Sequence, residues 1–312
     1  MGKFKEVHFI NTIPPTKRPG LLSPEVLVRI KDLSLVARGV VEGFVAGHHK
    51  SPYKGFSLEF AEHRKYVLGD ELRHIDWRVY GRTGKYFVKL FEAETNMRVH
   101  LVLDTSQSMG FSYGTNPSKL TYATYLAASL AFLIHRQQDL SGLVTFDETI
   151  TDFVPARHSQ QHLRHLMQRL SKVSSNGKTK TAEVLQKLAE RLRRRGLIVL
   201  FSDLLDDAES ILNAVARFRF HKHEVIVFHI LDNAEKVFPF KAMTTFEDLE
   251  TQARITVDPL ALRHDYLEGV EAFCKHYKTN FFKMKVDYIP VNTMIPFEYI
   301  LSSYLMSRKK LR

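Results

Sequence analysis

The pattern of apolar positions changes about a third of the way along the chain. From residue 97 onward, short and nearly continuous apolar runs alternate with stretches that carry apolar residues at helical spacing. Continuously apolar strands that alternate with helices predict a mostly parallel sheet with helices on both faces. We therefore expect a doubly wound α/β domain over residues 96–312.

The expected strands of this domain share a core of apolar, often β-branched or aromatic, residues. They are MRVHLVLD, SGLVTFD, ITDFV, GLIVLFSD, EVIVFHILD and FFKMKVDYI, of which SGLVTFD and ITDFV are expected to form a strand pair. Helices are expected at about 119–135, 159–172, 182–195, 208–220 and 260–277, and EYILSSYLMSRKK is expected to form the last helix.

Residues 1–95 follow a different pattern. A helix is expected at about 23–47, because Ser23 and Pro24 form a suitable helix start and apolar residues recur behind them. Residues 48–94 are rich in glycine and aromatic residues, which favours short strands and turns. We therefore predict a smaller N-terminal segment, 1–95, made of one helix and a β-rich part.

Among the predicted strands that end in an acid, the two whose ends matter are LVLD at Asp104 and LIVLFSD at Asp203. In open parallel sheets, ligands bind beyond the carboxyl ends of the strands. Ser106 and Ser108 follow Asp104 in DTSQS, and the loop SNGKTKT offers Thr179. Carboxylates and hydroxyls form an all-oxygen set that suits Mg²⁺, or Mn²⁺ or Ca²⁺. With so few anionic ligands, such an ion should accept a further carboxylate from another molecule.

These residues resemble a known motif. The sequence D-x-S-x-S, followed by G-x-T and by an acid after a strand, looks like the metal-ion-dependent adhesion site of von Willebrand factor A domains. GDELRHIDW at 69–77, together with GFSLEF, KLFEAET and RRRGLIVLFSDLLD, resembles the bacterial family called domain of unknown function 58. This resemblance covers most of the chain, from about Val41 to the last helix.

The resemblance implies a fold, a site and a partner. The fold is of von Willebrand factor A type behind the smaller N-terminal segment. The implied metal ligands are Asp104, Ser106, Ser108, Thr179 and Asp203. Family members are thought to act with MoxR-type AAA+ ATPases, as metal-dependent adaptors or chaperones for client proteins that the sequence does not name.

Two details of the loop KTKT bear on the implied site. Thr181 is an alternative to Thr179, although Thr179 keeps the expected spacing to the following helix. Lys180 stands where many A domains have Asp, and a cation there is expected to weaken metal binding.

The motif GDELRHIDWRVYGR has two interpretations. It is a binding surface if Asp70, Arg73, Asp76 and Arg82 are exposed. Alternatively, it is a buried network of acid–guanidinium pairs around Trp77, since buried charges need partners and tryptophan supplies packing. The second interpretation is the one we favour from the sequence.

Two enzymatic alternatives remain beside a non-catalytic binding protein. Ser112 in GFSYG matches the G-x-S-x-G of a serine hydrolase, but that serine should lie directly between a strand and a helix, whereas Ser112 falls in a loop. A metal-dependent hydrolase or phosphatase would use Asp104, yet such enzymes generally need a second acid two residues later, where Ser106 stands. We therefore expect no enzyme.

Composition and charge complete this picture. The formal net charge of +11 allows an acidic partner, but the basic residues are spread along the chain and no nucleic-acid motif accompanies them, so nucleic acid is an unlikely partner. The single cysteine, Cys274, suits a reducing compartment. The most apolar stretch, TYATYLAASLAFLIH, is shorter than the roughly 20 residues of a membrane span. We expect a cytoplasmic protein.

Overall fold

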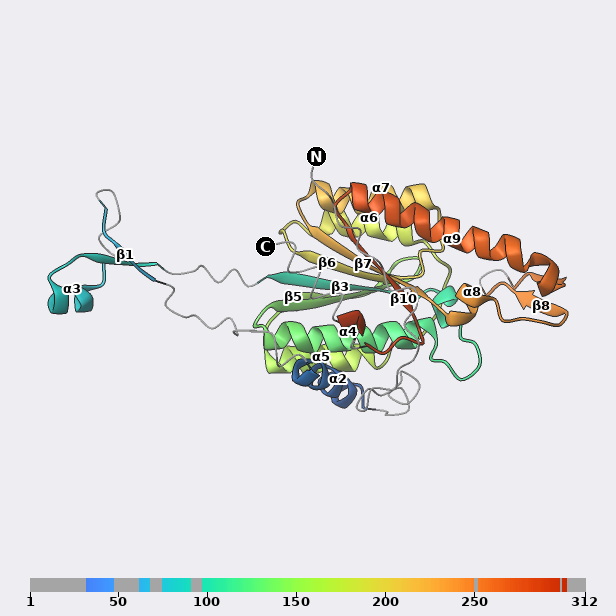
Figure 1. Cartoon of the computed structure of the whole chain (residues 1–312), viewed down its shortest axis with the longest axis horizontal. Helices are drawn as coiled ribbons and strands as arrows, with labels where there is room; N and C mark the ends of the chain where they lie inside the picture. Colours follow the sequence, from blue (N-terminus) through green and yellow to red (C-terminus); the bar gives the residue numbers. More distant parts are fainter. Residues whose placement is uncertain are drawn as a thin grey trace.

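A six-stranded sheet with helices on both faces forms the centre of the computed structural model (Figure 1). The structure describes residues 32–47, 62–67, 75–90, 97–249, 252–297 and 299–301. The strand order is β10-β7-β6-β3-β4-β5, and of these six strands only β5 runs antiparallel to its neighbour. The doubly wound, mostly parallel α/β architecture expected from the sequence is confirmed.

The strands of this sheet, apart from the last one in the chain, follow the predicted apolar runs closely. Their bounds are β3 (Arg98–Asp104), β4 (Leu140–Phe146), β5 (Ile150–Arg157), β6 (Leu197–Ser202), β7 (Glu224–Leu231) and β10 (Asp287–Asn292). The central strands β3 and β6 are neighbours, with Leu103 opposite Phe201. Their carboxyl ends therefore lie side by side.

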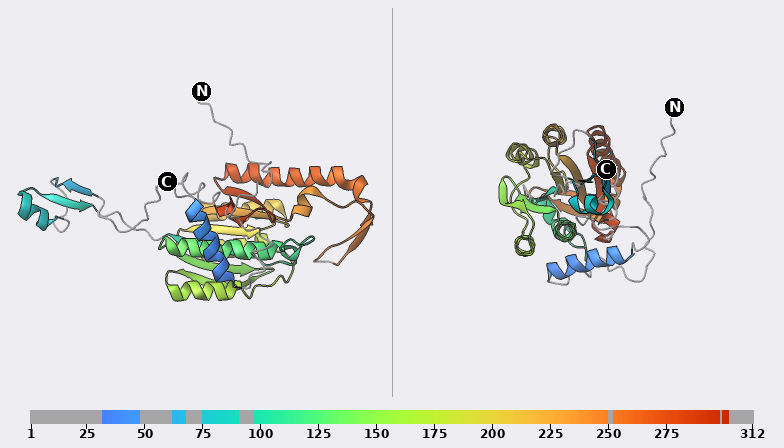
Figure 2. Two further views of the ribbon diagram at one scale, coloured as in Figure 1. Left: turned by 60° about the horizontal axis from the view of Figure 1, so that its bottom comes forward. Right: turned by 90° about the vertical axis from the view of Figure 1, so that its left-hand side faces the viewer.

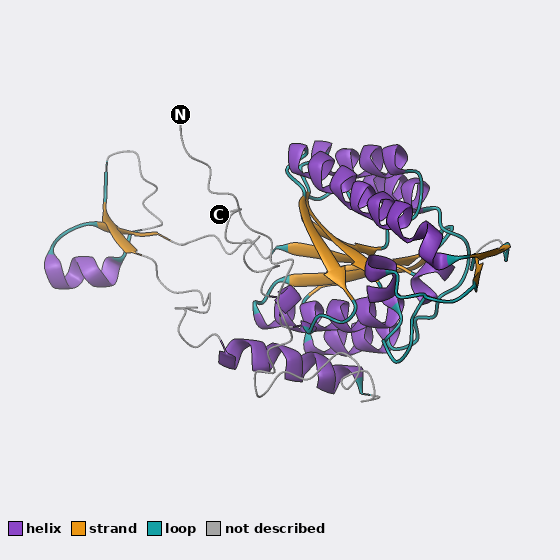
Figure 3. Cartoon of the chain, turned by 45° about the vertical axis from the view of Figure 1, so that its right-hand side comes forward, coloured by secondary structure: helices purple, strands orange, loops and turns teal. Residues whose placement is uncertain are grey.

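Helices lie in two layers, one on each face of the sheet (Figure 3). One layer contains α2 (Leu33–Gly47), α4 (Lys119–Arg136) and α5 (Gln160–Leu170), and the other contains α6 (Thr181–Arg191), α7 (Ala208–Phe220) and α9 (Pro259–Lys283). Because side chains alternate across a strand, Leu101 and Leu103 face the first layer and Val102 the second. Burying each such side chain contributes about 1.5–3 kcal/mol.

The helix α2 packs onto the first layer. Its apolar residues Leu33, Val36, Ala37, Val40 and Val41 are buried in the same core as α4, and Figure 2 shows α2 lying across that helix. The division of the chain at residues 95 and 96 stays a prediction, although this packing joins α2 to the sheet. The part of the predicted helix before residue 32 lies outside the described residues.

The last helix and strand of the sheet differ from the prediction. The sequence FFKMKVDYI was expected to be a strand, but α9 continues to Lys283 and β10 begins only at Asp287. Tyr277 and Phe281, one helical turn apart, are both buried against the second layer, so tertiary packing extends the helix. Most of EYILSSYLMSRKK, namely residue 298 and residues 302–310, lies outside the described residues.

Three short elements beyond the carboxyl edge of the sheet were not predicted. They are α8 (Asn233–Val237), β8 (Thr244–Glu247) and β9 (Arg254–Val257), of which β8 and β9 form an antiparallel hairpin. Aromatic rings connect this region: Phe238 lies 5.8 Å from Phe246 and 4.4 Å from Tyr266, measured between ring centroids. These contacts join α8, the hairpin and the first half of α9.

The N-terminal segment contains a small unit of β1 (Glu62–Lys65), α3 (Trp77–Thr83) and β2 (Phe87–Leu90). Asp76 caps α3, because its carboxylate accepts the amide N–H groups of Arg78 and Val79 at 2.9 and 3.2 Å. Trp77 is 60% exposed. Its ring meets Tyr80 edge-on in the first turns of α3.

The exposure of Trp77 contradicts the favoured interpretation of the GDELRHIDW motif as a buried network around this residue. Arg82 is exposed as well, whereas Asp76, which the surface interpretation expects to be exposed, is buried. The physical reason is that α3 is only two turns long and leaves one side of the tryptophan uncovered. Asp70 and Arg73 lie outside the described residues.

Alanine substitutions at two glycines, one beside the sheet and one in a covering helix, are expected to change the free energy of unfolding in opposite directions. A Cβ on Gly196, just before β6, would lie 2.5 Å from the backbone carbonyl oxygen of Arg98, whereas a Cβ on Gly269 in α9 would meet nothing within 4 Å. We expect Gly196→Ala to lower the free energy of unfolding by about 1–3 kcal/mol. Gly269→Ala should raise it by roughly 0.5–1 kcal/mol through helix propensity. Urea denaturation measures both, and an unchanged midpoint for Gly196→Ala would contradict this strand contact.

Candidate functional site

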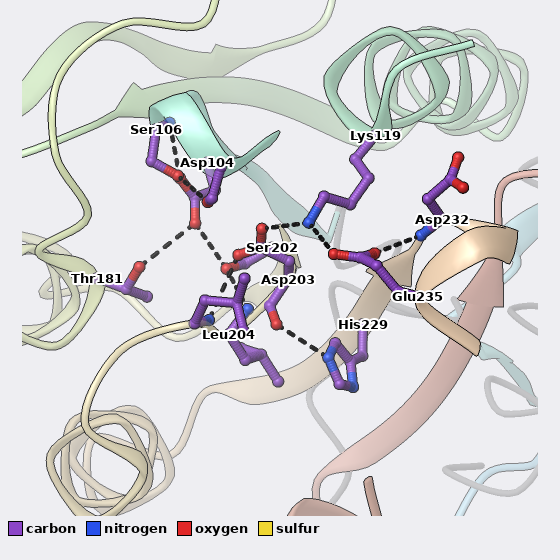
Figure 4. Close-up of polar contacts among 12 residues, drawn as sticks. Asp104, Ser106, Lys119, Thr181, Ser202, Asp203, Leu204, His229, Asp232 and Glu235 are labelled. Carbon is purple, nitrogen blue, oxygen red and sulfur yellow. Dashed lines mark hydrogen bonds and ion pairs between the residues drawn. The ribbon is translucent and has the colours of Figure 1, made fainter. Parts of the chain in front are cut away.

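Asp104 and Asp203 occupy adjacent positions at the carboxyl edge of the central strands (Figure 4). Asp104 is the last residue of β3, and Asp203 directly follows β6. Both side chains are completely buried. Two acids have therefore been removed from water at one edge of the sheet, where each needs hydrogen bonds or a nearby cation.

Hydrogen bonds reach both carboxylate oxygens of Asp104. The backbone N–H of Ser106 donates to Oδ1 at 3.0 Å. The hydroxyl of Ser202 donates to Oδ2 at 2.6 Å, and the hydroxyl of Thr181 donates to the same oxygen at 3.3 Å. These neutral donors stabilise the ionised form, but they bring no positive charge.

Ser106 and Ser108 place two hydroxyls beside Asp104. Their Oγ atoms are 3.1 Å apart, and Ser106 is fully buried. The short 3₁₀ helix η2 (Gln107–Gly110) turns the chain here, so that the side chains at alternate positions lie together. The predicted ligands Asp104, Ser106 and Ser108 are thus brought into one group.

The loop that contains Thr179 is tied to this segment by its backbone. The N–H of Asn176 donates to the carbonyl of Thr105 at 2.9 Å, and the N–H of Gln107 donates to the carbonyl of Gly177 at 3.1 Å. Gly177 has φ +71°, a left-handed conformation that glycine adopts without strain. It is Thr181, at the start of α6, whose hydroxyl reaches Asp104. Thr179 is half-buried in the loop.

Asp203 forms an ion pair with Lys119, a residue that the sequence analysis did not select. The Nζ of Lys119 lies 2.8 Å from Oδ2 of Asp203 and 2.8 Å from Oε1 of Glu235. The lysine side chain is only 1% exposed. Burial lowers the pKa of Lys119, but the attraction of Asp203 and Glu235 outweighs it and raises the pKa overall, so the ammonium stays charged.

Further contacts hold this ion-pair network in place. The second oxygen of Glu235 accepts the backbone N–H of Asp232 at 2.6 Å, which makes Glu235 part of the capping box of α8. His229 lies beneath Asp203, and its Nε2 donates to the Asp203 carbonyl at 2.9 Å. Burial lowers the pKa of His229 to about 4, so this imidazole is neutral.

Asp104 is the acid of this group whose negative charge is least compensated by its neighbours. Burial, and then the negative charge of Asp203, raise the pKa of Asp104 to about 6, against the lowering effect of the hydrogen bonds from Ser202 and Ser106. Burial also raises the pKa of Glu235, with Lys119 acting in the opposite direction. When ionised, Asp104, Asp203 and Glu235 carry three negative charges against the one positive charge of Lys119, which pairs only with Asp203 and Glu235, so two negative charges are left without a countercharge among these four residues.

A family model described as "Protein of unknown function DUF58" matches residues 62–274, more than half of the chain. The chain belongs to the DUF58 family. The match includes Asp104, Lys119 and Asp203, so the whole ion-pair network lies inside the family region.

This DUF58 protein is similar to mycobacterial proteins that are themselves uncharacterised. Uncharacterised proteins of Mycobacterium tuberculosis and Mycobacterium bovis are each 27% identical over 267 residues, which cover 83% of this chain and 82% of the relative.

Two solved structures of other proteins are also similar to this chain. BatB, a conserved hypothetical protein from Bacteroides thetaiotaomicron, has a TM-score of 0.45 at 16% identity and covers 68% of this chain and 99% of its own. The VWA domain of SpRpn10 has a TM-score of 0.37 at 10% identity and covers 67% of this chain and 94% of its own.

Sequence reasoning missed Lys119, Ser202 and Glu235. Ser202 had a usable signal, because it precedes Asp203 and ends a strand that must lie beside Asp104 in a parallel sheet. Lys119 and Glu235 had none, since a lysine at a helix start and a glutamate in a short polar stretch are normally exposed. Ser112 is exposed on the loop after η2 and is not part of the group around Asp104.

The raised pKa of Asp104 predicts how stability depends on pH. In metal-free protein, the folded state holds its proton up to about pH 6, while the unfolded state loses it near the ordinary pKa of 3.8. Folding stability should therefore fall as pH rises through this window, by an amount on the order of 3 kcal/mol. Asp104→Asn should remove this fall and be more stable than wild type at pH 7.

Asp207→Asn supplies the control for this titration. Asp207 is the exposed N-cap of α7, and hydrogen bonds from Ser210 lower its pKa. Its stabilising contribution should be present at neutral pH and disappear as pH falls, which is the opposite sign. Urea denaturation between pH 4 and 8 compares the three proteins. A wild-type curve parallel to that of Asp104→Asn would contradict the raised pKa.

Proposed function

We propose that this DUF58 protein is a non-catalytic adaptor that binds other proteins at the carboxyl edge of its sheet, with the help of a divalent cation. The observation that carries the proposal is the group of Asp104, Ser106 and Ser108, in which two hydroxyls 3.1 Å apart lie beside a buried carboxylate. Oxygen ligands of this kind suit Mg²⁺, and also Mn²⁺ or Ca²⁺.

The charge of the site fits such an ion. Two negative charges remain uncompensated among Asp104, Asp203, Glu235 and Lys119, and a divalent cation would balance them. Among the described residues, no cluster of three or more His, Cys, Asp and Glu side chains is arranged to hold a metal. An ion here would therefore depend on hydroxyl oxygens as much as on carboxylates.

Asp104, Ser106 and Ser108 are the residues we propose as ligands, with a threonine from the loop before α6. Thr179 is the predicted candidate, and Thr181 is the one already in contact with Asp104. The Oδ2 atom of Asp203 pairs with Lys119, while its Oδ1 accepts the backbone N–H of Leu205 at 3.4 Å. When bound, the ion would supply a positive charge that a partner's carboxylate can approach.

Exposed apolar residues around the site support a protein as the partner. Tyr113, Leu205 and Met294 follow η2, β6 and β10, so all three lie on loops at the carboxyl edge. They are 42%, 47% and 49% exposed. Apolar side chains grouped on one face around a polar centre are typical of protein-binding surfaces.

The identity of the partner rests on family resemblance. A MoxR-type AAA+ ATPase is the partner that this resemblance implies, with an unnamed client protein as the third component. We further propose that the protein works in the cytoplasm. Across the part of the chain that the structure describes, no helix is both long and apolar enough to cross a membrane.

The geometry favours neither enzymatic alternative. The hydrolase or phosphatase alternative lacks the second acid that such an enzyme generally needs two residues after Asp104, because Ser106 stands there. Ser112 is exposed on a loop and does not lie on a strand-to-helix turn.

Metal-dependent partner capture tests the proposal. The protein is immobilised and offered a MoxR-type ATPase from the same organism. The buffer contains either EDTA or about 5 mM Mg²⁺, a concentration well above the Kd of a weak divalent-cation site. We expect retention with Mg²⁺ only, and Asp104→Ala should reduce it at least about tenfold, because truncating a central charged contact costs more than 1.4 kcal/mol.

Ser112→Ala is the matched control, since it changes a nearby exposed serine outside the proposed ligand set. It should retain the ATPase as wild type does. Circular dichroism must show that Asp104→Ala is folded. Equal capture with Mg²⁺ and with EDTA would contradict a metal-dependent adaptor.

A further inference from the structure

Lys119 is an unusual residue at its position in the fold. It lies in the first turn of α4, a helix that is otherwise almost entirely buried and apolar, and its own side chain is buried with it. Removing an ammonium and its carboxylate partners from water costs several kcal/mol per ion unless their pairing is excellent, and well-packed hydrophobic residues often do as well. Stability alone therefore does not explain a lysine here.

The position of the lysine relative to the site points to a different role. Its ammonium contacts Asp203, which neighbours Asp104 across the strand ends and raises its pKa by repulsion. A fixed positive charge paired with the neighbouring acid repels a divalent cation at Asp104, and the buried surroundings strengthen this repulsion. The lysine thus offsets part of the attraction that the two aspartates exert.

Glu235 provides the counterpart of this effect. Its Oε1 lies 2.8 Å from the Lys119 ammonium, on a different side from Asp203 (Figure 4). The capping box of α8 holds Glu235 in this position. Without Glu235, one lysine would neutralise one aspartate completely. With Glu235, the charge of Lys119 is divided between two carboxylates.

We infer that Lys119 and Glu235 together set the affinity of the site for a divalent cation, Lys119 by weakening it and Glu235 by strengthening it. The inference deepens the proposed function and rests on it. Lys119 is a residue that controls affinity through charge and is not itself a ligand. A weak site of this kind holds an ion firmly only when a partner's carboxylate adds to the ligand set.

Four proteins test the inference by calorimetric titration of Mg²⁺ and Mn²⁺. Lys119→Met adds one net negative charge to the site and should bind Mg²⁺ at least about tenfold more tightly than wild type. Glu235→Gln removes one negative charge and should bind it about tenfold more weakly. The double variant Lys119→Met/Glu235→Gln has the formal charge of wild type and should bind with nearly wild-type affinity.

Thermal unfolding with and without Mg²⁺ gives a second readout. Mg²⁺ should raise the melting temperature of Lys119→Met more than that of wild type, because the ion compensates the two carboxylates that lost their cation. If Lys119→Met does not fold, the comparison of Glu235→Gln with the double variant carries the test. The double variant should then bind Mg²⁺ more tightly than Glu235→Gln.

The outcomes separate this inference from the proposed function. Affinity changes of opposite sign, cancelled in the double variant, support it. Unchanged affinities, or changes of the same sign in both single variants, overturn it and leave Lys119 a purely structural residue. If wild type does not bind Mg²⁺ but Lys119→Met does, the inference holds while the metal dependence of the proposed function fails. If none of the four proteins binds either ion, both fail.

Discussion

The burial of two carboxylates at the ends of neighbouring parallel strands is the constraint around which this protein is arranged. Asp104 and Asp203 are fully buried at the carboxyl edge of β3 and β6. Repulsion between acids in such a place cannot be relieved by water. The serines, the threonine and the lysine around them supply hydrogen bonds or positive charge to the two acids, whereas Glu235 shares the lysine with Asp203.

The two acids are compensated in different ways. Asp104 receives only neutral donors, from Ser106, Ser202 and Thr181, and its pKa is raised. Asp203 receives the ammonium of Lys119. Asp104 therefore has a negative charge that a cation from solution can neutralise, whereas Asp203 is already paired with Lys119. This asymmetry is what links the fold to the proposed binding of a metal ion and a partner.

Much of this arrangement could be predicted from the sequence, because it depends on local pattern. Apolar runs that end in Asp104 and Asp203, in a chain that alternates strands and helices, place both acids at one edge of a parallel sheet. The spacing of Ser106 and Ser108 gave the rest of the group around Asp104. The choice between Thr179 and Thr181 depends on where α6 begins, and boundaries are the least certain feature of a sequence pattern.

The ion-pair network could not be predicted, because its partners are far apart in sequence. Lys119 is separated from Asp203 by 84 positions and from Glu235 by 116. Each looks like an ordinary surface residue in its local context, and only the packing of α4 against the sheet and the capping of α8 bring them together. Trp77 is the opposite case. It was expected to be buried, but its short helix, α3, does not provide the contacts that would cover it.

Anomalous diffraction from crystals grown with Mn²⁺ tests the central claim most directly, because it locates the ion without assuming its ligands. The account predicts a single strong anomalous peak at the carboxyl edge, within coordination distance of the hydroxyls of Ser106 and Ser108 and beside Asp104, with Lys119 still bound to Glu235. An edge without a peak at saturating Mn²⁺, or a peak only at surface carboxylates elsewhere, would contradict it.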